Sequence, residues 1–484
     1  SNMKFNTSVY VLSFLPLTII CYYIICKYSY NAAKVFLIVV SMFFYSYAGI
    51  KGFYWLLISI FLNYLFSCIL KKQKSKLVLW VGISINIILL VYFKYTNFVI
   101  ATINQLFNKN IGDLNIILPI GISFFTFQQI SYIVDTYWGK TLQNSLLDYL
   151  LYITFFPKIL MGPIVKQSDL IPQFNDESKR KLSYENLVDG IQMFIIGLFK
   201  KVILADTFSL AVAWAYSLGD FSKITAMDTF LVIMAYTFQI YFDFSGYSDM
   251  AIASARMLNI NLSINFDSPY KALSIRDFWK RWHISLSKFL TEYVYIPLGG
   301  NRKGKIRTII NTMIVFLVSG LWHGANWTFV LWGLLNGVLS ILDRMTEKYR
   351  KNVHPALKWI STFIIVSFLW SLFQSNSITE WKNMIVQMLK FNDTSISTGL
   401  INCFILPETS FLNWLFKLKY FSVRIRGFWM ILFYLMSIIL CLGFENTYKM
   451  KHKKSILTAF YYGTLFIFTL TCIGTETVFV YFGF

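Results

Sequence analysis

The sequence predicts an all-α integral membrane protein, and three observations support this fold class. Of the 484 residues, 56% are hydrophobic and only 14% are charged, whereas about 25% of the residues of soluble domains are charged. Aromatic residues make up 19% of the chain, which is typical of proteins with many rings at membrane interfaces. Apolar runs long enough to cross a bilayer recur along the chain, and we count roughly eleven to thirteen of them.

The clearest candidate spans are apolar runs that few polar residues interrupt. Ser1 and Asn2 precede Met3 and are interpreted as a cloning remnant, so we expect a single membrane domain over residues 3–484. The first run lacks a small-residue cleavage site and is therefore read as a span. Spans are expected at residues 9–26, 35–49, 53–70, 77–93, 309–320, 327–342, 359–373, 428–442 and 456–473.

The net charge of +21 raises the question of nucleic-acid binding. Lysines and arginines cluster, however, in the loops between apolar runs, as the positive-inside rule expects of a membrane protein. The lysine clusters at residues 71–76 and 449–454 are predicted to be cytoplasmic, which places both termini outside, including the tail at 474–484. We expect no nucleic-acid partner. The cysteines show no metal-ligand spacing, and no metal site is expected.

The middle of the chain is less regular than its ends. Residues 118–138 and 155–165 are apolar but carry prolines, glycines and polar side chains. Irregular backbone at membrane depth is tolerated only where protein or a water-filled space surrounds it, so these stretches are predicted to wall an internal chamber. A long helix is expected at 187–216, interrupted by Lys200 and Lys201. Residues 374–426 are expected to form short helices.

Residues 274–298 predict one amphipathic helix, because apolar and basic residues alternate along them at helical spacing. Ser274 is its expected N-cap, and His283 falls within it. Such a helix lies at the membrane surface or dips into a chamber.

His323 lies inside the apolar run 318–332, where an ionisable side chain is expensive and usually functional. Histidine is the side chain best suited to remove a proton near pH 7, and acyl transfer needs such a base in a site that excludes water. The alternative to a catalytic role is a structural one, in which the histidine hydrogen-bonds two helices. This alternative has more weight for His283 than for His323. Asp243 and Asp249 either hold a catalytic or substrate group or form a structural contact between helices.

Several motifs around these residues resemble one known family. FWKRWHISLSKFLTEYVYIPLGGNRKG and SGLWHGANWTFVLWG are similar to blocks of the membrane-bound O-acyltransferase family, in its bacterial branch that O-acetylates alginate and peptidoglycan. LPIGISFFTFQ, FFPKILMGPI, YFDFSGYSDMA and NFDSPYKA match in the same order, and the blocks run from about residue 90 to 340. The resemblance implies a ring of tilted helices around a funnel, with His323 as catalytic histidine at its neck and His283 as the second histidine.

The resemblance also implies substrates and partners. The expected donor is acetyl-CoA from the cytoplasm, with no bound cofactor, and the acceptor is a polysaccharide reached through an extracytoplasmic SGNH-type acetyltransferase. Tyr481 matches a terminal tyrosine that accepts the acyl group, although it could equally anchor the chain at the interface. One departure is Gln374, near which an arginine is expected. Candidate contacts for the donor phosphates are Lys280, Arg281, Arg302 and Lys303, unless these are ordinary cytoplasmic charges, and Asn326 joins the two aspartates as a candidate supporting residue.

The expected function is therefore O-acetylation of a cell-surface or secreted polysaccharide by an enzyme of the bacterial cytoplasmic membrane. Two alternatives stay open at this point. One is D-alanyl transfer from a carrier protein to teichoic acid. The other is a transporter or scaffold without enzymatic activity, suggested by the broken middle helices and the polar residues at membrane depth.

Overall fold

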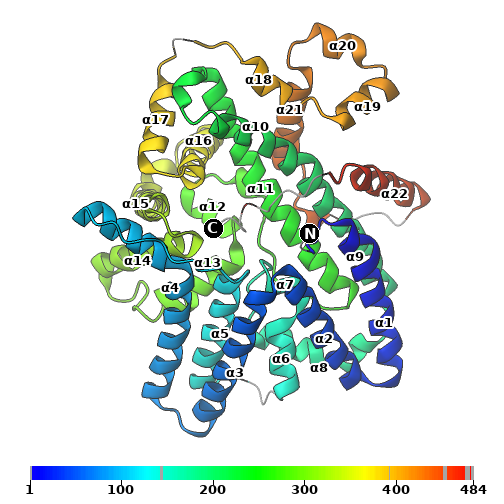
Figure 1. Ribbon diagram of the computed structural model, residues 1–484, viewed down its shortest axis with the longest axis vertical. Helices are drawn as coiled ribbons and strands as arrows, with labels where there is room; N and C mark the ends of the chain where they lie inside the picture. The colour runs from blue at the N-terminus through cyan, green and yellow to red at the C-terminus, as the bar shows by residue number, and fades with distance from the viewer. Residues whose placement is uncertain (1–2, 142–144, 392, 451–454, 475–479, 481–484) are drawn as a thin grey trace. The chain divides into compact units, whose positions relative to one another are not determined.

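The computed structural model describes residues 3–141, 145–391, 393–450, 455–474 and 480. Over these residues the chain is helical, and the only strand-like feature is an isolated bridge between Phe266 and Trp282. The chain divides into two compact units, Ser1–Ile195 with Tyr247–Ile264, and Ile196–Gly246 with Asn265–Phe484. Helix α11 (Ala226–Met257) contributes to both units. Figure 1 shows the order of the helices along the chain.

The first unit opens with the four expected spans. They are α1 (Leu15–Tyr28), extended at its start by a π-helical turn, α2 (Tyr30–Ala48), α3 (Ile50–Lys72) and α4 (Lys76–Phe107). All four are long and apolar enough to cross a membrane, which confirms these predictions.

Two buried amides fasten α3 to α4. Asn63 Nδ2 donates to Asn86 Oδ1 at 3.0 Å, and Asn86 Nδ2 returns a bond to Asn63 Oδ1 at 2.7 Å. Polar side chains of this kind hold helices together in lipid, where apolar contact alone gives no preference for protein over lipid tails.

The irregular middle of the chain is buried inside the first unit, as expected for backbone that breaks at membrane depth. It forms α5 (Ile122–Tyr137), α6 (Leu146–Thr154), the four-residue α7 (Phe156–Ile159) and α8 (Gln167–Asn175). Gly121 begins α5 with φ +72°, and a Cβ there would lie 2.9 Å from the carbonyl oxygens of Ile159 and Leu160. Only glycine allows this close approach.

The predicted long helix at 187–216 is present, with its interruption at the predicted place. It runs as α9 (Tyr184–Phe199), a π-helical turn η3 (Lys200–Ala205) and α10 (Asp206–Ser217). A π-helical turn inserts one residue into the helical repeat and often marks a functional position. Here it brings Lys201 against Asp243 of α11.

The amphipathic segment of the second unit differs from its prediction. It is two short helices, α12 (Ile275–Arg281) and α13 (Ile284–Leu290), followed by a π-helical turn, η6 (Thr291–Tyr295). Ser274 caps α12 as expected, accepting from the Asp277 N–H. The single helix was wrong because His283 adopts φ +45°, a left-handed conformation that ends the helical path.

Three long helices follow, α14 (Gly304–His323), α15 (Trp327–Arg350) and α16 (Pro355–Gln374), and all are capable of crossing a membrane. Helices α14 and α15 lie side by side (Figure 1). Glycines make this contact close, because a Cβ on Gly320 would lie 2.3 Å from the Phe329 carbonyl oxygen and one on Gly333 2.5 Å from the Phe316 carbonyl oxygen. Small residues at such crossings let helix backbones pack directly, and this packing holds the end of α14, where His323 lies.

A stability prediction follows from this contact. Replacing Gly320 with alanine should lower the stability by about 1–3 kcal/mol, because the new methyl group forces α14 and α15 apart. Gly463→Ala is the matched control, since Gly463 is also helical but has no atom within 4 Å of its would-be Cβ. The control should be neutral or stabilising by up to about 1 kcal/mol. Thermal unfolding of the purified protein in detergent compares the two, and equal midpoints would contradict the contact.

The remaining helices are mostly short, as expected for residues 374–426. They are α17 (Ile378–Leu389), α18 (Thr398–Asn402), α19 (Pro407–Leu415) and α20 (Lys419–Arg424), followed by the apolar α21 (Phe428–Gly443) and α22 (Ile456–Thr471). Seven described helices are long and apolar enough to span a membrane, with α21 and α22 as shorter apolar helices. The all-α membrane class is confirmed. The number of candidate spans among the described helices is smaller than the roughly eleven to thirteen expected from the sequence. The reason is that α5 and α10 are short and α11 carries many polar side chains.

Candidate functional site

The two histidines predicted to carry the chemistry lie together in the second unit. His323 is the last residue of α14, and His283 stands between α12 and α13. Their ring centroids are 6.3 Å apart, and the residues are 3% and 1% exposed. Forty positions of sequence separate them, so the fold of α12 to α14 creates this pair.

The backbone of His283 is held in an uncommon conformation, with φ 45° and ψ 53°. A left-handed conformation costs a non-glycine residue about 1–2 kcal/mol, and such strain often accompanies function. A segment eighteen residues upstream provides the restraint. Ile284 N–H donates to the Asn265 carbonyl at 3.0 Å, and Ser285 Oγ donates to Asn265 Oδ1 at 2.6 Å. On the other side, Asp267 N–H donates to the Arg281 carbonyl at 2.9 Å.

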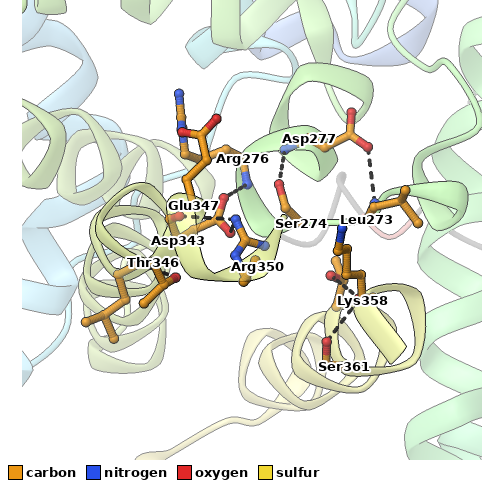
Figure 2. A network of polar contacts seen from close by, with 12 residues as sticks. Leu273, Ser274, Arg276, Asp277, Asp343, Thr346, Glu347, Arg350, Lys358 and Ser361 are labelled. Carbon is orange, nitrogen blue, oxygen red and sulfur yellow. Dashed lines mark hydrogen bonds and ion pairs between the residues drawn. The ribbon is translucent and has the colours of Figure 1, made fainter. Parts of the chain in front are cut away.

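Helix α12, which leads into His283, is fastened to α15 at its beginning (Figure 2). Ser274 Oγ accepts from the Asp277 N–H at 3.1 Å and caps the helix. The Arg276 N–H donates to Asp343 Oδ2 at 3.2 Å, and the Arg276 guanidinium pairs with Glu347 at 2.9 Å. Helix α15 begins at Trp327, shortly after His323. The contacts between α12 and α15 therefore join the helix that precedes His283 to the helix that follows His323.

Aromatic rings surround the histidine pair. Both imidazoles make edge-to-face contacts at centroid distances between 4.8 and 5.6 Å, from Phe244 and Trp322 to His283 and from Trp332 and Phe373 to His323. Four aromatic rings therefore lie directly against the two buried imidazoles.

Burial also sets the protonation state of His283, which lies outside the membrane-spanning helices. It lowers the pKa of His283 to about 3, because the charged imidazolium loses its hydration. The ring is therefore neutral at neutral pH. A general base works best with a pKa near the working pH, and burial moves the pKa of His283 away from that range.

Asp243 takes part in a buried ion pair. The Lys201 Nζ lies 2.7 Å from Asp243 Oδ1 and 2.8 Å from Asp206 Oδ1. The ion pair with Lys201 is a structural contact between helices, which is one of the two interpretations of Asp243 from the sequence. The other carboxylate oxygen, Oδ2, accepts from the Val480 N–H at 2.7 Å. Asp249 is buried six residues further along α11, within the first unit.

Asn326 supports the turn that follows His323. Its Oδ1 accepts from the Thr328 N–H at 3.1 Å and caps α15, while its Nδ2 donates to the Asn376 carbonyl at 2.8 Å. It thus fixes the start of α15 to the chain after α16.

The candidate phosphate contacts divide into two kinds. Lys280, Arg302 and Lys303 are exposed, whereas Arg281 pairs with Asp277 at 2.9 Å. A cation that already has a carboxylate partner is less available to a phosphate, so the exposed three remain the better candidates. Tyr481 lies outside the described residues.

Sequence reasoning missed two supporting residues in the second unit, and it missed the burial of one lysine in the first unit. Asn265 was noticed only as part of a motif, and Lys201 only as an interruption of a helix. Lys158 is 0% exposed and lies 2.6 Å from Gln128 Oε1 and 4.5 Å from the centre of the Tyr152 ring. For both Lys158 and Lys201, the signal available in the sequence was the position of a lysine within an apolar run. Within the described part of the chain, no group of three or more His, Cys, Asp or Glu side chains is placed to hold a metal ion.

Comparisons with known proteins identify the family of the chain. The family model for membrane-bound O-acyltransferases matches residues 143–379, which include both histidines. A peptidoglycan O-acetyltransferase of Helicobacter pylori is 36% identical over 447 residues, covering 85% of this chain and 83% of that protein. A probable alginate O-acetylase of Azotobacter vinelandii is 35% identical, covering 82% of this chain and 80% of that protein.

A more distant relative is a teichoic acid D-alanyltransferase of Bacillus subtilis. It is 28% identical over 265 residues, covering 52% of this chain and 66% of that protein. The matched family, the high coverage of the first two relatives and the helical membrane fold lead to one conclusion: the chain is an acyltransferase enzyme that belongs to the membrane-bound O-acyltransferase family.

Proposed function

We propose that this enzyme O-acetylates a cell-surface or secreted polysaccharide, peptidoglycan or an alginate-like polymer. It takes the acetyl group from a cytoplasmic thioester, acetyl-CoA, and passes it across the membrane. The observation that carries the proposal is the buried histidine pair, 6.3 Å apart between ring centroids and enclosed by aromatic rings. Two relatives at 35–36% identity are named for acetyl transfer to such polymers.

In the proposed reaction, His323 acts as general base. Its imidazole removes the proton of an acceptor hydroxyl while that oxygen attacks the thioester carbonyl. The carbon–sulfur bond breaks, an oxygen ester forms, and the imidazolium returns its proton to the departing thiolate. His283, neutral and fixed by its backbone, orients the acceptor or the carbonyl by a hydrogen bond. Exclusion of water by the surrounding rings prevents simple hydrolysis.

The proposed route ends on the outer face. Tyr481 accepts the acetyl group as a phenol ester, which divides one difficult transfer into two easier ones. An SGNH-type partner then moves the group to the polymer. Both termini are proposed to be extracytoplasmic, on the charge distribution of the loops. Lys280, Arg302 and Lys303 are proposed to meet the phosphates of the donor.

Purified protein incubated with acetyl-labelled acetyl-CoA tests this route. We expect base-labile label on the wild-type protein, loss of the label in Tyr481→Phe, and retention of the label in Tyr461→Phe. Tyr461 is an exposed tyrosine on α22 and serves as the matched control. Equal labelling of all three proteins would contradict the role of Tyr481, and absence of free CoA in every sample would contradict acetyl-CoA as the donor.

D-alanyl transfer from a carrier protein is the second candidate, favoured by more distant relatives such as the one in Bacillus subtilis at 28% identity. Supplying a D-alanyl carrier protein in place of acetyl-CoA distinguishes the two donors. We expect turnover with acetyl-CoA alone, and faster turnover with the carrier protein would reverse the assignment. The transporter or scaffold interpretation is set aside because the chain is an acyltransferase.

A further inference from the structure

A buried charged group lies in the second unit, outside the contacts made by the two histidines. Lys201 on the π-helical turn is 1% exposed and pairs with two carboxylates, Asp206 at 2.8 Å and Asp243 at 2.7 Å. Burying charges is expensive unless they are paired and hydrogen-bonded. A buried carboxylate is stabilised when both of its oxygens accept hydrogen bonds, so Asp243 favours a further donor besides Lys201.

The end of the chain supplies such a donor. The backbone N–H of Val480 donates to Asp243 Oδ2 at 2.7 Å, while Lys201 occupies Oδ1 of the same carboxylate. Hydrogen bonds to an ionised acceptor are short and roughly twice as strong as neutral ones. A main-chain contact of this kind holds the backbone at Val480 without depending on its side chain.

The same stretch of α11 reaches the histidine pair. Phe244 follows Asp243 directly, and its ring lies 4.8 Å from the ring of His283 in an edge-to-face contact. Asp243 therefore holds the backbone of Val480 next to a residue, Phe244, whose ring contacts His283. Val480, in turn, directly precedes Tyr481 in the sequence.

We propose that the Lys201–Asp243 pair is a docking point for the backbone at Val480, and that Asp243 is a positioning residue for acyl transfer to Tyr481, the next residue in the sequence. The transfer step rests on the proposed function, whereas the docking does not. Lys201 holds the carboxylate in place. Asp206 provides a second partner for Lys201 and makes no contact with Val480.

Asp243→Asn is the informative change, because an amide has one oxygen for two donors. The oxygen can face Lys201 or Val480, and the amide NH₂ group then repels the other donor. Asp206→Asn is the matched control, since it alters the same lysine but leaves the contact with Val480 intact. Both variants keep the volume of the side chain.

Hydrogen exchange at the Val480 amide, resolved by mass spectrometry on the full-length protein, measures docking directly. We expect protection in the wild type and in Asp206→Asn, and exchange about tenfold or more faster in Asp243→Asn. A wild-type Val480 amide that exchanges at the rate of an unstructured peptide would overturn the docking, and this result needs no variant to fold. Equal protection in Asp243→Asn would overturn the role of the carboxylate.

A second measurement separates positioning from general stability. In Asp243→Asn we expect label on Tyr481 to fall about tenfold or more, whereas Asp206→Asn, which alters the same lysine, keeps labelling within about twofold of wild type. An equal fall of labelling in both variants would overturn positioning. Protection of Val480 without any labelling of Tyr481 would support the docking and contradict only the proposed route through the tyrosine.

Discussion

Replacing His323 with alanine is expected to reduce acetyl transfer by a factor of about 10²–10⁴, the usual contribution of a general base. The residue ends α14 and is 3% exposed among aromatic rings. Among the described histidines, His283 is the one in ring contact with it. The base-labile O-acetyl content of the cell-surface polymer, measured in cells that depend on this gene, should fall to the level without the gene.

His354→Asn is the control for this experiment. His354 is exposed and caps α16, with its Nδ1 accepting from the Ala356 N–H. Asparagine is also a good N-cap, so this variant should keep both stability and acetylation. Wild-type acetylation in a well-expressed His323→Ala protein would contradict general-base catalysis by His323.

The second large effect concerns His283, where side chain and backbone can be separated. Asparagine tolerates the left-handed conformation better than most residues, so His283→Asn should preserve the turn between α12 and α13. We expect its thermal midpoint to stay near that of the wild type while the transfer rate falls about 10²-fold, because the oriented imidazole is lost. His283→Ala should lose activity to the same extent and also unfold at a lower temperature.

Comparing the two variants decides what His283 contributes. If His283→Asn transfers acetyl groups at the wild-type rate, the residue serves only the turn. If both variants unfold at the wild-type temperature, the left-handed backbone at φ +45° is not under strain. Rates come from CoA release by purified protein, and midpoints from thermal unfolding in the same detergent.

The sequence was sufficient to predict the parts that depend on local pattern. Apolar runs predicted the four opening spans and α14, α15 and α16, because hydrophobic length determines whether a helix can cross a bilayer. A histidine within an apolar run predicted a buried position for His323. The lysines at 200 and 201 predicted the interruption that appears as a π-helical turn.

The sequence was not sufficient where distant segments set the local structure. In the sequence, the helical spacing of apolar residues continues across Trp282 and His283. No glycine stands at this point to indicate a left-handed backbone conformation. The turn is held by Asn265, eighteen positions upstream, through bonds that only the folded chain brings together. The contact between Val480 and Asp243 is similarly non-local, since 237 positions separate its two residues.

The rate at which free CoA thiol appears in a single turnover tests the central claim most directly. Purified wild-type protein, in excess over acetyl-CoA, is compared with His323→Ala and His354→Asn under the same conditions. We predict a fast release of thiol with stoichiometric movement of acetyl to a hydroxyl in the wild type and in His354→Asn, and a release slower by about 10²-fold or more in His323→Ala. Equal thiol release in all three proteins would contradict catalysis by the buried histidine pair.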